Sequence, residues 1–250
     1  REVARLESLG LPRAGSWLNA TPIPALGLKL RPSEFVMASR LRLGCPVYEE
    51  EGPCPLCLQP SDIYGDHALC CGSGGERITR HNALRDHLYQ LASSAALSPA
   101  RESRFLLPGQ DRRPADVLIP SWAGGLDAAI DVTVVNPLQT ALVAGAAATP
   151  GHALNFRYDT KMAGAAEECR QEGIVFLPVV VETLGGWHQG AVQQVKKLAG
   201  AKARHTGQEE EEALRHAFTR LSILLMKGNA AILSNRIPNF SPSHIDGIQQ

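Results

Sequence analysis

The sequence predicts a mixed α/β (α+β) fold in which helices pack on the faces of one mixed sheet. Three observations predict this class. The chain has 250 residues and is 44% hydrophobic, enough to bury a sizeable core. Segments with helical periodicity alternate with short apolar segments rich in β-branched residues. Their order is helix, three strands, helix, strand, and a three-strand meander followed by a crossover helix produces a mixed sheet.

Composition excludes some functional classes. The formal net charge is zero, so no whole-chain basic footprint indicates a nucleic-acid partner, and any such surface must be local. No stretch is apolar and long enough to cross a bilayer, so no membrane partner is expected. The chain begins at Arg1 rather than at a methionine, and we therefore expect it to be part of a longer protein.

The first 76 residues contain few regular elements. Pro12, Pro22, Pro24 and Pro32 divide the leader, residues 1–50, into short pieces. Within it, Ser33 is expected to cap a short helix over 34–43. Residues 44–76 are rich in Cys, Gly and Pro, and this segment is too small to fold on apolar burial alone. We therefore expect a small module over 51–76 that needs a metal ion or a similar staple.

The remainder, residues 77–250, is predicted to form one α/β domain with closing helices. Leu84, Leu88 and Leu91 at helical spacing predict a helix over 82–96. Apolar runs predict the strands that follow. The run over 174–182 is almost entirely apolar, as is typical of a central strand that is buried on both faces. The predicted strands are 102–107, 115–120, 127–135 and 174–182, and the further helices are 152–172, 188–205 and 209–234.

The segment CPLCLQPSDIYGDHALCC has the spacing of a zinc site. Cys54 and Cys57 are two residues apart, and His67 with Cys71 supplies a second pair. Four such ligands suit one structural Zn²⁺ ion. Cys70 competes with Cys71 for the fourth position, and a loop of unmetallated thiols is the alternative interpretation. A clustered zinc site of this kind favours a reducing compartment over a disulfide-bonded secreted protein.

A second constellation consists of carboxylates on neighbouring predicted strands. Asp116 begins one strand and Asp131 lies in the middle of the next, between apolar residues, where an ionised carboxylate is costly without a partner. A Mg²⁺ ion is one such partner, with Glu102 as a third carboxylate. The alternative is that Asp116 caps a turn and that Asp131 pairs with an arginine such as Arg113 or Arg157.

Lys161, on the helix after the third strand, is the candidate group for orienting an attacking water or stabilising charge. Basic residues are also concentrated over 77–113, and Arg80, His81 and Arg113 are candidate nucleic-acid contacts. A second basic stretch contains Lys196, Lys197, Lys202 and Arg204, and we interpret it as a solvated helix face.

Taken together, the motifs CPLC…GDHALCC, GGERITRHNALRDHL, RPADV and AIDVTVV resemble the C-terminal region of non-LTR retrotransposon polyproteins, over roughly residues 15–235. That region carries a Cys-Cys-His-Cys knuckle followed by a restriction-like PD-(D/E)XK endonuclease with an αβββαβ core. The resemblance implies that Asp116 and Asp131 bind the catalytic Mg²⁺ ion and that Lys161 replaces the lysine usually found two residues after the second acid, where this chain has Thr133. Ala115 is an insertion relative to the PD motif.

The resemblance also implies an activity and partners. A protein of this family is expected to be a Mg²⁺-dependent endonuclease that nicks target DNA by phosphodiester hydrolysis in the nucleus. Its partners would be target DNA, element RNA and the reverse transcriptase domain of the parent polyprotein. The competing hypothesis is a catalytically inactive nucleic-acid-binding or assembly module, which the absent lysine after Asp131 favours.

Overall fold

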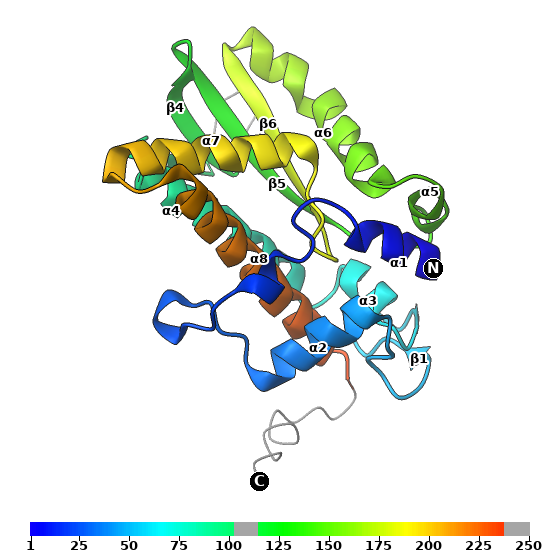
Figure 1. Cartoon of the computed structure of the whole chain (residues 1–250). Coiled ribbons are helices and arrows are strands. Elements are labelled where there is room, and N and C mark those ends of the chain that lie inside the picture. Colours follow the sequence, from blue (N-terminus) through cyan, green and yellow to red (C-terminus); the bar gives the residue numbers. More distant parts are fainter. Residues whose placement is uncertain (103–114, 238–250) are drawn as a thin grey trace.

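A computed structural model describes residues 1–102 and 115–237 (Figure 1). The fold is mixed α/β, as predicted. The helices in these ranges are α1 (Glu2–Leu9), η1 (Ser16–Asn19), η2 (Pro24–Leu26), α2 (Pro32–Leu43), α3 (Asp66–Cys70), α4 (Glu76–Ser93), α5 (Val143–Ala148), α6 (His152–Gln171), α7 (Gln189–Thr206) and α8 (Glu210–Ser234). The strands are β1 (Gly52–Pro53), β2 (Pro60–Ser61), β3 (Ala100–Arg101), β4 (Val117–Ala123), β5 (Leu126–Val135) and β6 (Ile174–Glu182).

The larger sheet has the strand order β3-β4-β5-β6. The pairs β3–β4 and β4–β5 are antiparallel, and β5–β6 is parallel. Gly124 and Gly125, with φ of 59° and 82°, form the tight turn between β4 and β5, a conformation that glycine adopts without steric cost. A parallel pair needs a long crossover, and α6 lies on the connection from β5 to β6.

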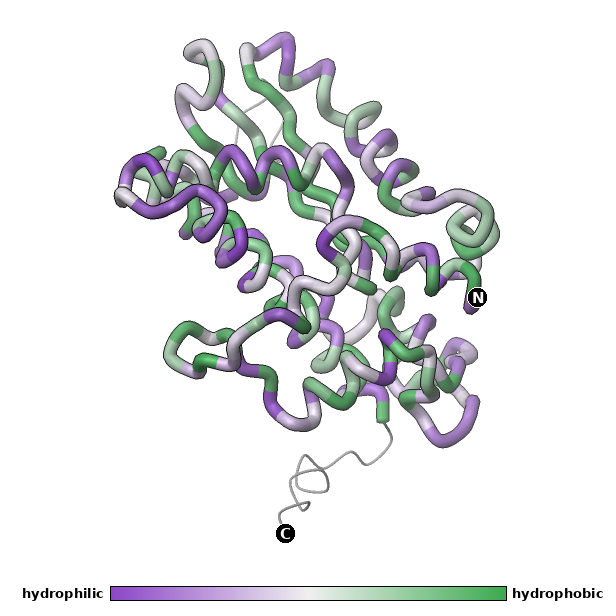
Figure 2. The backbone as a smooth tube through the Cα atoms, viewed as in Figure 1, coloured by the Kyte–Doolittle hydropathy of each residue, from purple (hydrophilic) through white to green (hydrophobic). Residues whose placement is uncertain are grey.

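The two faces of the sheet are covered by different helices. Side chains alternate along β5, so that Ala128, Ile130 and Val132 point toward the core formed with α4, α7 and α8. Ala129 belongs instead to the cluster that contains the buried α6 residue Cys169. Figure 2 shows hydrophobic residues along the strands and alternating hydrophilic and hydrophobic residues along α6 and α7. Each face of the sheet is therefore closed by amphipathic helices.

Helix α8 connects the sheet core to the N-terminal segments. It packs against α4 and α7 on one side and against α2 and α3 on the other. A second apolar cluster combines Met37 and Leu41 of α2, Leu69 of α3 and Leu233 of α8. The leader and the metal module thus share one buried cluster with the C-terminal helix.

Several predicted elements differ from the structure at their ends. The strand 174–182 is confirmed, but α4 starts at Glu76, well before the predicted residue 82. Helix α2 starts at Pro32, so Ser33 is not its cap; the Glu34 carboxylate instead accepts a hydrogen bond from the Arg31 N–H at 2.8 Å. Helix α5 was not predicted.

The expected strand 102–107 lies almost wholly outside the described residues, and β3 ends just before it. Cys169 and Trp187 are both buried core residues. None of the helices in the described ranges is long and apolar enough to cross a membrane.

Glu182 ends β6 as a buried carboxyl, only 1% exposed. Burial raises its pKa to about 7, although a hydrogen bond with Ser8 opposes the increase. The folded protein therefore retains a proton that the unfolded chain releases near pH 4.5. The contribution of this group to stability is present below about pH 4.5 and is lost as pH rises to about 7.

Replacing Glu182 by Gln should flatten this pH dependence. The unmutated protein should lose on the order of 3 kcal/mol of unfolding free energy through this group between those pH values, and Glu182→Gln should remove that loss. Urea unfolding at a series of pH values measures it. Glu172→Gln, at an exposed position, is the matched control; equal pH slopes for the two variants would contradict the account.

Candidate functional site

The first half of the metal module is a turn between β1 and β2. The Leu58 N–H donates to the Cys54 carbonyl, and the Cys54 N–H donates to the Gln59 carbonyl, each at 2.8 Å. Leu58 has φ of 63°, which lets the chain reverse within this short segment. These bonds bring Cys54 and Cys57 onto the same side of one tight turn.

The second half is the short helix α3, whose start is fixed by Asp62. Its carboxylate accepts hydrogen bonds from the backbone N–H groups of Tyr64, Asp66 and His67, at 2.9, 3.0 and 2.8 Å. An acidic side chain that accepts several N–H bonds at a helix start satisfies donors that the helix leaves unpaired. His67 and Cys71 are thereby presented from one turn of helix.

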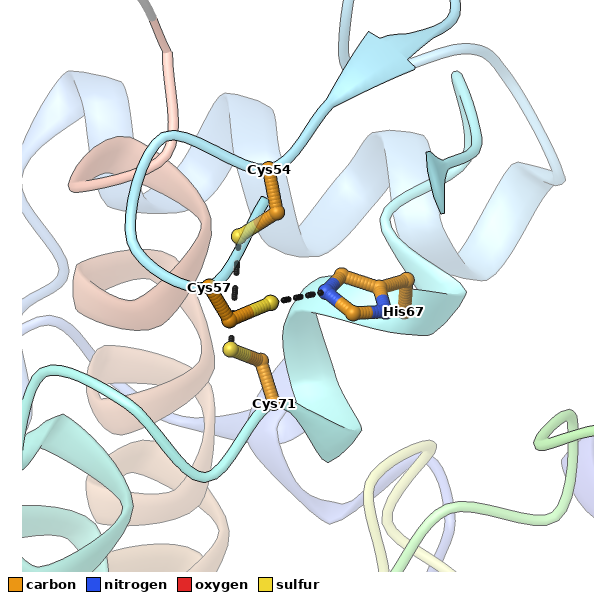
Figure 3. Close-up of side chains that lie close together, drawn as sticks. All are labelled: Cys54, Cys57, His67 and Cys71. Atoms are coloured by element: carbon orange, nitrogen blue, oxygen red, sulfur yellow. Dashed lines mark hydrogen bonds between the residues drawn. The ribbon is translucent and has the colours of Figure 1, made fainter. Parts of the chain in front are cut away.

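Figure 3 shows the four predicted zinc ligands pointing toward one another. Their ligand atoms all lie within 4.8 Å of one another. The Cys54 and Cys71 Sγ atoms are 4.0 Å apart, and Cys57 Sγ is 3.3 Å from His67 Nε2. A tetrahedral Zn²⁺ site requires about 3.8 Å between sulfurs and roughly 3.6 Å between sulfur and nitrogen. The donor set and spacing therefore fit a structural zinc ion.

Cys71, not Cys70, lies in this cluster. The Cys70 Sγ is engaged elsewhere, because it accepts a hydrogen bond from the Asn136 Nδ2 at 3.5 Å. Burial opposes ionisation of Cys71, yet the Ser73 N–H and the Arg236 guanidinium outweigh it and lower the pKa of this thiol to about 6. A thiolate is the form that binds zinc, so the surroundings of Cys71 favour metal binding.

The module is fixed to the rest of the protein through the end of α8. Ala68 and Leu69 pack with Ile232 and Leu233 in the second apolar cluster. The Tyr48 hydroxyl donates to the Leu233 carbonyl at 3.1 Å. The metal site is thus held against the helix that also forms the sheet core.

The predicted carboxylates lie opposite each other on neighbouring strands. β4 and β5 pair with the register Val117↔Ile130, which sets Asp116 across from Asp131. The Asp116 N–H donates to the Ile130 carbonyl at 2.8 Å and continues this pairing beyond β4. Because opposite residues of an antiparallel pair point to the same face, both carboxylates lie on one side of the sheet.

Each oxygen of Asp116 has a partner. His81 Nε2, from α4, lies 3.0 Å from Asp116 Oδ1. The backbone N–H of Val132 donates to Asp116 Oδ2 at 2.6 Å. These contacts fix the orientation of this carboxylate and bring the start of α4 to the site.

Asp131 is paired with Lys161 from α6. The Lys161 Nζ lies 3.1 Å from Asp131 Oδ1 and 2.8 Å from Oδ2. Burial raises the pKa of the Asp131 carboxyl; Lys161 and His81 oppose the increase, whereas Asp116 adds to it. The cation therefore favours the ionised form of a carboxylate that its apolar strand disfavours. Lys161, rather than the alternative Arg157, occupies this position.

His81, Asp131 and Lys161 line a pocket of about 380 Å³ between the metal module, α4, β5 and α6, and Asp116 lies outside its lining. Its charged lining consists of Arg77, Arg80, His81, Asp131 and Lys161. Gly72 and Gly75 also line the pocket and add no side chain. A Cβ added at either glycine would meet no other atom within 4 Å. Cationic groups outnumber acidic ones, so the pocket favours an anionic ligand.

A buried chain of hydrogen bonds runs from this pocket to the metal module. Arg80 Nη1 donates to the Asn229 side-chain oxygen at 2.7 Å, and Asn229 Nδ2 donates to the Thr183 carbonyl at 2.7 Å. The Thr183 hydroxyl donates to the Asn136 Oδ1 at 3.0 Å, and Asn136 Nδ2 donates to the Asp66 carbonyl at 3.1 Å. The four side chains that form this series of hydrogen bonds, Arg80, Asn229, Thr183 and Asn136, are all buried.

Arg80, at the pocket end of these hydrogen bonds, is 3% exposed. Burial lowers its pKa to about 10, and its Nε has no hydrogen-bond partner. Arg80 is therefore a structural link between α4 and α8. Of the two predicted phosphate contacts on α4, His81 is the better placed for a ligand.

The other predicted residues are less central. The Glu102 carboxylate forms an ion pair with Arg85 of α4 and does not line the pocket. The Glu102 N–H does donate to the Asp116 carbonyl at 3.1 Å, so it supports the position of that residue. Arg113 lies outside the described residues, and its predicted contact with nucleic acid stays a prediction.

Sequence reasoning did not single out the residues of the buried chain. Asn136 follows β5 and Asn229 lies in the apolar part of α8, so each is a polar residue at a position where an apolar one is expected. That anomaly is the available signal, since buried amides require partners. Arg236 was missed because its contacts, to Glu76 and the Ser73 carbonyl, join distant segments.

The chain matches no protein-family model and none of the curated proteins compared with it.

Removing one predicted ligand should abolish zinc binding. We expect about one zinc ion per purified chain, and Cys71→Ser should lose it, with a lower thermal unfolding midpoint because the module depends on the metal for folding. Elemental analysis and thermal unfolding measure the two effects. Cys70→Ser, which alters the neighbouring thiol, is the matched control and should retain the metal. Equal zinc content in both variants would exclude the assigned ligand set.

Proposed function

We propose that this chain is a metal-dependent DNA endonuclease with a restriction-like PD-(D/E)XK fold, which nicks its target by phosphodiester hydrolysis. The observation that carries the proposal is that Asp131 and Lys161 line one anion-favouring pocket, with Asp116 directly across from Asp131 on the neighbouring strand. Two consecutive strands and the crossover helix contribute these groups, and each was expected from the sequence to act at one site.

The order of elements supports the restriction-like fold. Helix α4, strands β3, β4 and β5, helix α6 and strand β6 follow the αβββαβ order of that core. The acids lie on the central antiparallel pair and the lysine on the crossover helix. Thr133, at the usual lysine position, is compensated in this proposal by Lys161.

The residues fit a Mg²⁺ ion by the chemistry of their donors. Asp116 and Asp131 supply carboxylate oxygens on one face of the sheet, and Mg²⁺ binds through one or two carboxylates while it keeps several waters. When bound, the ion would lower the pKa of a water and stabilise the leaving oxygen. Glu102 is paired with Arg85, so we assign it no contact with the reacting phosphate.

The protein groups around the pocket have distinct roles in this proposal. Arg77 is exposed at the pocket and attracts the phosphate backbone. Lys161 orients the attacking water and stabilises negative charge on the phosphate. The water oxygen bonds to phosphorus as one ester P–O bond breaks, leaving one end as phosphate and the other as hydroxyl. His81 holds Asp116 in place.

The zinc module would serve to dock nucleic acid beside the pocket. Gly72 directly follows the ligand Cys71 and lines the pocket. The buried chain through Asn136 joins the module to Arg80. A ligand that contacts the module therefore lies close to the acids. The target DNA, the element RNA and a reverse transcriptase domain stay proposed partners.

One observation favours the second candidate function, a nucleic-acid-binding module without catalysis. Both acids already have cationic or histidine partners within the protein, Lys161 for Asp131 and His81 for Asp116. An acid satisfied in this way gains less from a metal ion. In that case the pocket would still bind phosphate through Arg77 and Lys161.

Asp131→Asn should abolish nicking of supercoiled DNA in the presence of Mg²⁺. Removal of one group that stabilises the transition state costs about 10²–10³ in kcat, and this change removes a metal ligand. Asp127→Asn is the matched control, because Asp127 is on the same strand outside the pocket. Conversion of supercoiled to open-circular DNA measures both.

The same assay separates the two functions. Nicking by the unmutated chain at a rate that Asp131→Asn leaves unchanged would overturn the assignment of the site. DNA binding by the unmutated chain with no nicking, at any Mg²⁺ concentration, would establish the non-catalytic module instead.

A further inference from the structure

A second cavity of about 490 Å³ lies between α7 and the end of β4. On α7 it is lined by a stripe at helical spacing, which includes Lys196, Lys197, Gly200 and Arg204. Gly200 lies in the middle of the stripe and adds no side chain, and the Arg204 guanidinium and the Glu210 carboxylate lie over it. None of these residues lines the pocket that contains Asp131.

The cavity carries a local excess of positive charge. Lys196, Lys197 and Arg204 are all exposed, and Glu210 is the one acid in its lining. The chain as a whole has no net charge, so this concentration is a property of the place and not of the composition. A clustered positive surface attracts polyanions over the distance of a Debye length.

The opposite wall is aromatic. Trp122, near the end of β4, is half-buried and packs at the edge of the main core beside Leu97. The other two tryptophans, Trp17 and Trp187, are 4% and 1% exposed. Trp122 is therefore the tryptophan with surface available to a ligand, and an indole ring stacks on an unpaired nucleobase.

The spacing of the cations suits a polymer of phosphates. From residue 196 to residue 204 the helix rises about 12 Å, at 1.5 Å per residue. Every nucleotide of a strand carries a phosphate, so the stripe is long enough to contact more than one phosphate. Phosphate contacts beside a stacking platform are the combination found in proteins that bind single strands.

We propose that this cavity binds a segment of single-stranded nucleic acid, with Lys196, Lys197 and Arg204 on its phosphates and Trp122 stacked on a base. A single strand is favoured over a duplex because stacking on Trp122 requires a base that is not paired. The basic part of α7 is then a binding surface and not a solvated helix face. The proposal is independent of cleavage at Asp131.

Titration with a short oligothymidine, about 12 nucleotides long, tests this without added divalent ions. Fluorescence anisotropy of the labelled strand gives the affinity, and tryptophan emission reports on Trp122. We expect quenching of that emission on binding. Trp122→Leu should abolish the quenching and weaken binding roughly five-fold or more.

The double variant Lys197→Gln and Arg204→Gln tests the phosphate contacts. It should reduce the slope of log K against log salt by about 1.4, since each phosphate contact of a single strand contributes about 0.7. The double variant Lys29→Gln and Arg40→Gln removes the same charge from exposed positions in the leader and is the matched control. Circular dichroism verifies that all variants are folded.

The outcomes are decisive. The cavity is supported as a single-strand site if the slope of log K against log salt falls in the α7 double variant but not in the leader control, and if binding quenches the emission of Trp122. Equal changes in both double variants, unquenched Trp122 emission, or equally tight binding of a polyglutamate peptide overturns it. Nicking assays measure the other pocket separately, so failure of one proposal is distinguishable from failure of the other.

Discussion

The carboxylate of Asp131 lies in the middle of β5, between the buried residues Ile130 and Val132. An ionised group at such a position is costly unless a counter-charge accompanies it. Lys161 supplies that charge across the face covered by α6, and so the register of β5 and the placement of the crossover helix are tied to one ion pair. A pair of this kind adds little net stability. The proposed metal site would account for its presence in an apolar strand.

The second constraint is the buried chain from Arg80 through Asn229 and Thr183 to Asn136. Leaving any of these buried polar groups without a hydrogen bond would cost folding free energy. The series of hydrogen bonds therefore stabilises one arrangement of α4, α8, β5 and β6. The same arrangement sets the metal module beside the acids. Zinc in that module would then stabilise both the local fold and the geometry of the neighbouring pocket, because Asn136 also donates to the Asp66 carbonyl at the start of α3.

Sequence patterns sufficed where the signal is local. Strand 174–182, the ligand pairs Cys54–Cys57 and His67–Cys71, and the pairing of neighbouring strands all follow from spacing within a few residues. Contacts between segments that are distant in the sequence could not be predicted from such patterns. The start of α4 was missed because Glu76 is positioned by Arg236 and Asn235 at the end of α8. The cavity beside α7 was missed for the same reason, since Trp122 reaches it from a different element.

The central claim is that Asp116 and Asp131 together bind a divalent metal ion. A crystal structure of the protein with Mn²⁺, using anomalous scattering to locate the ion, tests it most directly. The account predicts an anomalous peak between the two carboxylates, with oxygen ligands and with Lys161 displaced from Asp131 toward the pocket. A structure with no Mn²⁺ at this position, and with Lys161 still paired to Asp131 at saturating metal, would contradict it.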